Sequence, residues 1–378
     1  MRVAYVSAVV LAGCGFSPGG AAVDAGAGHP SDTHVASDGC TSLTAMFDTC
    51  SLGAGSDLTI DQNATYDTDS GTLAFADGTS RAMPDKQVGN LDVMIVGALV
   101  VDATLTGSGA HAFGIYASSV MIAGGGLVTV AAGGAGTQNA NCAPRTAGIG
   151  SADINGAGGG GGGGFGGNGG SGEPGAQHSK NTGNGGDKIA WNADLTGGCD
   201  GALGGVGHTG SAPGAGGVAG GALVIIAQGE LMIQAGGGLD AGGGGGLGGI
   251  NNSGGGGGGT GGLIALVAKT IANAGFITAN GGGGGGGGTD NESSSYGSAG
   301  SNGSHDATPA PGGAPAADDT NNAGPGAAGG AGSTPDGATN QTQVNDGGGG
   351  GGGGVGFILE KGTASGGGIT SPPAIAGT

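Results

Sequence analysis

The chain has 378 residues, of which 106 are glycine and 13 are proline, a share typical of low-complexity sequence unless a period organises it. Only 9% of the residues are charged and 3% are aromatic, and since each glycine inside a helix costs about 1 kcal/mol relative to alanine, an all-α fold is excluded. Collagen is excluded because the glycines come in runs instead of at every third position. The net charge of −19 repels nucleic acid and anionic lipid alike, and nucleic acid is not expected as a partner.

The N-terminus predicts export. Met1-Arg2 is followed by a short apolar stretch, Val3 to Leu11, which is typical of a signal peptide and too short for a membrane span. Leu11-Ala12-Gly13-Cys14 resembles a bacterial lipobox. This resemblance implies a signal peptide at 1–13 and a lipid anchor on Cys14, where at least two acyl chains give stable membrane attachment. The alternatives are an ordinary signal peptide with an incidental cysteine and, because the apolar stretch is short, a misplaced start codon.

The residues after Cys14 predict a tether and then a cap. Gly15 stands where an Asp would mark inner-membrane retention, so the lipobox resemblance implies the outer membrane or the cell surface. Residues 14–39 are Gly, Ala, Ser, Pro and Asp with little apolar content, which predicts a flexible tether. Residues 40–90 alternate polar with apolar or β-branched residues at 56–60 and 64–68, and we expect short strands there, in an N-terminal cap.

Four cysteines remain once Cys14 is set aside. In an oxidising compartment we expect disulfides between near neighbours, Cys40 with Cys50 and Cys142 with Cys199, although four cysteines allow three connectivities. A zinc site is not predicted, because the sequence has no CxxC and no histidine at ligand spacing.

A repeat occupies residues 91–374. Each unit has an apolar strand, a small-residue bend, a second apolar strand, a glycine-rich turn and a last apolar group. The five units begin at Val93, Gly114, Leu223, Leu263 and Phe357. Such short strands cannot close a core alone, but stacked coils would give each strand a parallel neighbour and bury ladders of Leu, Ile, Val and Met. We therefore expect an all-β fold, a single parallel β-helix (solenoid). The alternative is a β-sandwich, whose antiparallel hairpin signals are weak here.

Long insertions interrupt the coils at 137–219, 247–260 and 287–350, and glycine runs bracket them. We expect each excursion to leave and return at the same corner, with its glycine stems side by side. One hypothesis is that the stems form extended polyglycine-II helices held by backbone hydrogen bonds, and the other is disordered polyglycine. The segment Asp290–Asp346, rich in Ser, Asn, Asp, Pro and Ala, is predicted to be disordered.

The sequence argues against an enzyme. A lyase needs converging cations, and only Lys269 and Lys361 of the lysines and arginines fall in repeat segments. Glu230 and Asp240 share a coil and could supply the paired carboxylates of a hydrolase, but single polar residues are expected on outward strand positions anyway. The histidines are scattered over the tether and loops without a Ser/His/Asp or HExxH arrangement; they are His29, His34, His111, His178, His208 and His305.

No cofactor and no metal site is predicted. The glycine runs contain no GxxxxGK[ST], which argues against nucleotide binding. Thr182–Ala190 resembles one nonapeptide of the calcium-binding RTX β-rolls, but such sites need tandem copies, and the pair Asp67 and Asp69 is an equally weak signal. Diffuse screening of the negative surface by calcium is the stronger expectation. Trp191 predicts a small core for its loop or a contact residue at the tip.

From Cys14 onward the chain resembles the glycine-rich, lipid-anchored envelope proteins of Gram-negative bacteria and, more loosely, the glycine-rich surface proteins of the PGRS type. This resemblance implies a non-enzymatic surface lipoprotein that displays glycine-rich loops to envelope or extracellular-matrix components. One alternative is a carbohydrate-binding or polysaccharide-active β-helix, with Glu230, Asp240 and an aromatic residue in one groove. The other is binding to ice or another ordered surface, although repeated outward Thr-x-Thr is absent.

Overall fold

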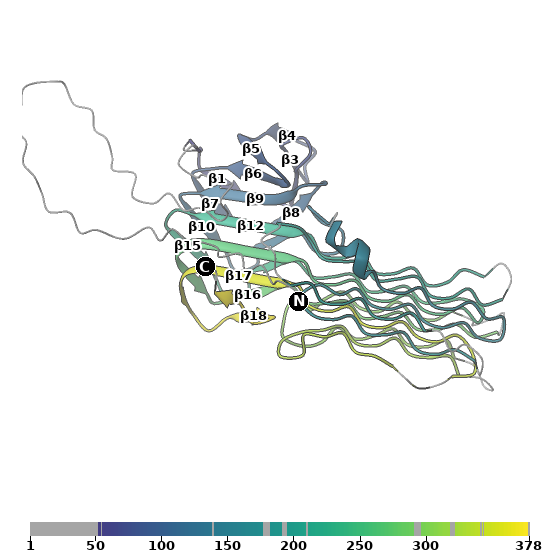
Figure 1. Cartoon of the computed structure of the whole chain (residues 1–378). Helices are drawn as coiled ribbons and strands as arrows, with labels where there is room; N and C mark the ends of the chain where they lie inside the picture. The colour runs from purple at the N-terminus through teal and green to yellow at the C-terminus, as the bar shows by residue number, and fades with distance from the viewer. Residues whose placement is uncertain are drawn as a thin grey trace, which may run out of the picture. The chain divides into compact units, whose positions relative to one another are not determined.

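The computed structural model describes residues 52–53, 55–137, 140–176, 182–190, 195–208, 211–290, 296–317, 322–340, 342 and 344–376 (Figure 1). They belong to one compact unit, Gly39–Thr378. The predicted signal peptide at 1–13 and the tether at 14–39 lie outside the described residues, as do Cys14, Cys40 and Cys50.

The all-β class is confirmed: the regular structure described is strand, apart from one 3₁₀ helix, η2 (Ala140–Arg145). The first strands are β1 (Leu58–Ile60), β2 (Ala64–Asp67), β3 (Thr72–Phe75), β4 (Ser80–Ala82), β5 (Asp85–Val88), β6 (Leu91–Ile95), β7 (Ala98–Val101) and β8 (Thr104–Ser108). The next are β9 (Ala112–Ala117), β10 (Ser119–Ile122), β11 (Leu127–Thr129), β12 (Ala222–Ala227), β13 (Glu230–Ile233) and β14 (Gly238–Asp240). The last are β15 (Leu263–Asn273), β16 (Phe276–Thr278), β17 (Phe357–Ser365), β18 (Ile369–Ser371) and β19 (Ile375–Ala376).

These strands pair in three parallel ladders. β6, β9, β12, β15 and β17 form the first ladder, and β1, β7, β10, β13 and the second half of β15 form the second, in the same sheet. The third ladder, β2, β8, β11, β14, β16 and β18, belongs to the other sheet. All five predicted repeat units supply strands to these ladders, and the predicted parallel pairing is confirmed.

The register of the ladders explains the core. In the second ladder the partners of successive strands are Leu58, Leu99, Val120, Leu231 and Ile271, each at most 4% exposed. Because side chains alternate between the two faces of a strand, matching register stacks apolar residues on the inner face. Residues of both sheets meet in one apolar cluster between them.

The β-sandwich alternative is right in one respect, since two curled sheets face one core (Figure 1). Its antiparallel hairpins occur only at the N-terminal side of the described strands, where β3 pairs with β2 and β4, and β5 pairs with β6. The region predicted as a cap, 40–90, supplies β1 to β5, of which β1 and β2 join the second and third ladders by parallel pairing.

The glycine-rich segments form a second module, in which extended segments run side by side away from the sheets (Figure 1). We call it the glycine bundle, and it comprises the described residues of 146–221, 242–262, 281–317 and 322–356. Backbone hydrogen bonds connect its segments, and the expected side-by-side stems are confirmed: Gly259 donates to Gly244 at 2.9 Å, and Gly350 donates to Gly285 at 2.8 Å.

Hydrogen bonds in the bundle repeat every three residues. From 254 to 262, one set of N–H groups, at 254, 257 and 260, donates to residues 205, 202 and 199. The second set, at 255, 258 and 261, donates to residues 348, 351 and 354, and the third, at 256, 259 and 262, donates to residues 247, 244 and 241. A segment with three residues per turn thus faces three acceptor neighbours in rotation, which is the periodicity of the polyproline-II conformation.

Glycine is required because the segments lie so close. An ideal Cβ on Gly257 would stand 1.9 Å from the carbonyl oxygen of Gly161, so in glycine a Cα hydrogen points at that oxygen.

The predicted disorder of Asp290–Asp346 is wrong for the residues described there. Gly297 and Gly300 donate to Gly249 and Gly246, and Ala327 donates to Gly350. This segment therefore completes the bundle, because its small residues take part in the same network of backbone hydrogen bonds as the glycine runs. We call this network the backbone lattice.

Candidate functional site

The structure does not bring Glu230 and Asp240 together. Glu230 lies at the start of β13 in one sheet and is exposed, whereas Asp240 ends β14 in the other sheet and is 5% exposed. The structure therefore gives no support for Glu230 and Asp240 as the paired carboxylates of a polysaccharide hydrolase.

Asp240 instead holds a loop of the third insertion. Its Oδ1 accepts hydrogen bonds from the Gly242 N–H at 2.9 Å and from the Thr278 hydroxyl at 3.2 Å, and its Oδ2 lies 3.2 Å from His305 Nε2. The His305 ring stacks on Phe276, with 4.7 Å between ring centroids. The hydrogen bond to Asp240 raises the pKa of His305, so an ionisable contact ties this loop to the sheets.

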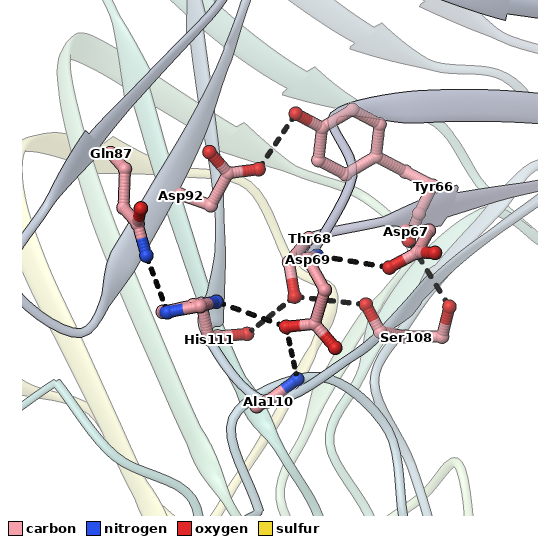
Figure 2. Close-up of polar contacts among 9 residues, drawn as sticks. All are labelled: Tyr66, Asp67, Thr68, Asp69, Gln87, Asp92, Ser108, Ala110 and His111. Atoms are coloured by element: carbon pink, nitrogen blue, oxygen red, sulfur yellow. Dashed lines mark hydrogen bonds and ion pairs between the residues drawn. The ribbon is translucent and has the colours of Figure 1, made fainter.

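A second polar cluster joins the N-terminal strands (Figure 2). His111 Nδ1 lies 3.0 Å from Asp69 Oδ1, and its Nε2 faces the side-chain amide of Gln87. The Tyr66 hydroxyl donates to Asp92 Oδ2 at 2.8 Å, and Asp92 is 2% exposed. Burial raises the pKa of both Tyr66 and Asp92, while the hydrogen bond from Tyr66 acts in the opposite direction on the pKa of Asp92.

This cluster resembles a catalytic triad only in its Asp–His contact. The second imidazole nitrogen faces Gln87 instead of a nucleophile, and the Ser108 hydroxyl contacts the Tyr66 carbonyl oxygen. The Thr68 hydroxyl donates to the Ser108 carbonyl at 2.9 Å. The cluster thus connects β2, β5, β6 and β8 with Thr68, Asp69 and His111 between strands, and no hydroxyl group in it contacts the imidazole.

The weak calcium signals have other roles. Asp67 Oδ1 accepts from the Asp69 N–H at 2.9 Å, which is a local turn. Thr182–Ala190 is a bundle segment, in which Gly183 donates to Gly159 and Gly186 donates to Gly162. Within the described part of the chain, no group of three or more His, Cys, Asp or Glu residues is placed to hold a metal ion.

Of the two expected disulfides, Cys142–Cys199 is present, with 5.6 Å between the Cα atoms. It links η2 to a bundle segment 57 residues further along the chain. The pairing of Cys40 with Cys50 falls outside the described residues, as does Trp191.

A row of exposed apolar side chains crosses one side of the bundle, and sequence reasoning missed it. Four neighbouring segments form a layer there: Gly150 donates to Leu203, Gly201 donates to Gly217, and Leu247 donates to Ala215. Their exposed side chains, which define what we call the outer face, are Ile149, Leu203, Val206, Val218 and Leu247, and each is 42–66% exposed.

The three-residue period explains why these side chains are exposed. In the second segment, Gly201 and Gly204 donate sideways to the third segment, while Ala202 and Gly205 donate to the deeper segment at 158–161. Residues 200, 203 and 206 are left to point outward, and all three are exposed. The signal was therefore present in the sequence as bulky residues spaced three apart among glycines.

A groove of about 600 Å³ opens at one end of the outer face, beside the disulfide. Its lining comprises Gly133, Thr137, Cys142, Thr146, Ala147, Ile149, Val218 and residues 198–203. The volume is within the range of small-ligand pockets, and the outer-face residues Ile149, Leu203 and Val218 form its apolar side.

Comparison of the chain with protein-family models, with curated proteins and with solved structures gave no match. Among the described residues, no helix has the length and apolar character needed to cross a membrane.

Proposed function

We propose that this protein is a non-enzymatic surface lipoprotein, a structural or adhesive scaffold that displays the glycine bundle to a partner. In this proposal the three ladders are the faces of a short parallel β-helix, in which β6–β8, β9–β11, β12–β14, β15–β16 and β17–β18 are successive coils. The support is that each strand pairs in parallel with the equivalent strand of the next coil. The bundle segments correspond to polyglycine-II helices, as their three-residue hydrogen-bond period suggests.

The observation that carries the proposal is the organisation of the insertions. They account for much of the chain, and a backbone lattice orders them into one module with an apolar outer face. Glycine loses more conformational entropy on ordering than any other residue, so an ordered module this rich in glycine is costly to form. A display role gives the ordered module a function that accounts for this cost. In neither polar cluster described above does a hydroxyl group contact the imidazole of the histidine.

Anchoring and display are tested in cells. The full chain is produced in a diderm bacterial host supplied with a radiolabelled fatty acid, beside a Cys14→Ala variant. We expect the parent protein to carry the label and the variant to lack it. We also expect protease added outside the cells to release the C-terminal epitope of the parent protein. An unlabelled protein, or one protected from external protease, would contradict the anchored surface role.

The order of the bundle is tested by hydrogen exchange. Peptides that cover 254–262, 281–288 and 347–354 are expected to exchange as slowly as those from β9, β12 and β15, because their N–H groups are bonded. Exchange at the rate of unstructured glycine would overturn the display module while leaving the lipid anchor untouched.

A further inference from the structure

The outer face is unusual for a water-exposed surface. Nine large apolar residues of the described chain are at least 40% exposed, and five of them are the outer-face residues. Exposed apolar side chains scattered singly need no explanation, but a grouped set on one layer indicates an interaction surface. The segments below are held by backbone hydrogen bonds, so this surface is preorganised and little ordering entropy is lost when it is covered.

The adjoining groove adds a charge to this apolar surface. Asp200 is the charged residue in the groove lining, as far as the chain is described, and it is exposed. Its Oδ1 accepts the Ala219 N–H at 2.7 Å, which fixes the carboxylate beside Leu203 and Val218. A carboxylate can accept several hydrogen bonds at once, so Asp200 retains capacity for a donor from a ligand.

Charge and shape together select the occupant. A net charge of −19 draws cationic partners and repels anionic ones. The apolar side of the groove favours aliphatic or aromatic side chains of a ligand, and the fixed carboxylate favours an ammonium or guanidinium group.

We propose that the outer face and its groove bind a cationic amphipathic peptide segment of a partner protein. The apolar side chains of the segment cover Ile149, Leu203 and Val218, and its lysine or arginine pairs with Asp200. This inference names the partner class for the display function proposed above, but the binding itself does not require the lipid anchor.

The test measures binding of the purified, oxidised full chain to a fluorescent peptide of leucines and lysines by anisotropy. One control peptide replaces each leucine with serine and keeps the charge, and another replaces each lysine with glutamate and keeps the leucines. We expect both controls to bind about tenfold more weakly or worse, because each lacks half of the complementarity. Equal binding of the serine–lysine peptide would overturn the proposal, since diffuse charge alone would then explain the affinity.

Matched variants locate the site. Asp200→Asn and Asp187→Asn change the net charge equally, and both aspartates are exposed on the bundle, but Asp187 is not in the groove lining. We expect the first to weaken binding about fivefold or more and the second less than about twofold. Leu203→Ser and Ile369→Ser form the apolar pair, at 45% and 40% exposure, and only the first is expected to weaken binding.

Two outcomes contradict the site. Equal effects within either variant pair would place the peptide elsewhere, and sedimentation that shows the chain dimerising through the outer face would assign it to a second copy. Failure of fatty-acid labelling at Cys14 would remove the anchor but leave these binding results as they are, so the two proposals fail separately.

Discussion

At the scale of single residues, Glu173 illustrates how the bundle ends. In the segment at 347–356, every third N–H group donates to a neighbouring segment. Val355 donates to Pro335 and Gly352 donates to Ala338, so the next donor in the series is Gly349. That N–H is instead bonded by Glu173 Oε2 at 3.3 Å, and the side chain is 1% exposed. The carboxyl thus substitutes for a backbone carbonyl near the end of the lattice, while its Oε1 has no hydrogen-bond partner among the residues that the structure describes.

Burial gives Glu173 a marked pH dependence. It raises the pKa of this carboxyl from 4.5 to about 7. The folded state therefore keeps a proton that the unfolded state releases, so the contribution of Glu173 to stability is fully present below pH 4.5 and is lost as the pH rises through about 7. We expect Glu173→Gln to stabilise the protein at pH 8 by up to roughly 3 kcal/mol relative to the parent, and to have little effect near pH 4. Urea unfolding at both pH values measures this, with exposed Glu230→Gln as the control. A Glu173→Gln effect that is the same at both pH values would refute the titration.

His305 predicts a second pH dependence of the same sign. Because Asp240 raises its pKa, the stabilisation is fully present below the ordinary histidine pKa and is lost as the pH rises through the raised value. The imidazole is about half exposed, so the expected loss for His305→Gln at pH 5.5 is only about 0.5–1 kcal/mol, falling toward zero at pH 9. Thermal unfolding of the two proteins checks the difference. A difference that grows with pH would contradict the assignment.

At the scale of elements, the bundle segments tolerate no side chain toward their neighbours. Gly257→Ala would place a methyl group 1.9 Å from a carbonyl oxygen of the adjacent backbone, which cannot move aside as a side chain could. We expect a loss of about 3 kcal/mol, at the upper end of overpacking effects, and faster hydrogen exchange across 254–262. Gly367→Ala is the control, since no atom lies within 4 Å of its Cβ position, and its expected change is below about 0.5 kcal/mol. Similar losses at both positions would indicate that the lattice is not close-packed.

The disulfide joins an irregular element to the bundle. With a sequence separation of 57 between its cysteines, loop-closure entropy predicts that Cys142→Ser with Cys199→Ser costs up to about 4 kcal/mol. The groove is expected to lose its shape first, because both cysteines line it. Denaturant unfolding of the double variant, and of the parent after reduction, measures the loss. An unchanged midpoint would mean that neighbouring segments hold η2 without the crosslink.

The strands could be predicted from the sequence and the segment Asp290–Asp346 could not. Apolar runs such as those beginning at Val93 and Leu223 predict buried strands in any sheet arrangement, and both strands are buried on both faces, so the local pattern suffices. Order at 296–317 and 322–340 depends on partners elsewhere in the chain, which composition does not reveal. A period of three was nevertheless visible, since Gly297, Gly300 and Gly303 all bond back to one neighbouring segment.

At the scale of the whole molecule, the net charge of −19 destabilises the folded state through repulsion among carboxylates, which the 8 lysine and arginine side chains offset only in part. We expect the melting temperature of the full chain to rise by about 3 °C or more between 10 mM and 300 mM NaCl, because salt screens the repulsion. Calcium chloride at matched ionic strength is expected to act similarly, as diffuse screening requires. A much larger effect at micromolar calcium would contradict diffuse screening and point to a specific site.

The candidate site was less predictable than the fold for a geometric reason. The contact of Asp240 with His305 joins residues 65 apart, and the outer face joins segments from two insertions. Such juxtapositions depend on which bundle segments become neighbours, and glycine runs carry little information about that choice. The anchor at Cys14 rests on sequence alone and stays a prediction.

The three-residue repeat also sets a rule for how the insertions can change in length. Adding or removing three residues within a segment returns each remaining residue to the same neighbour, whereas a change of one or two residues rotates the rest of the segment by about 120°. Such a rotation would turn Leu203 from solvent toward the packed interior and leave the following hydrogen bonds without partners. We therefore expect viable length variants of this protein to differ by multiples of three residues within the segments, with other lengths confined to the turns.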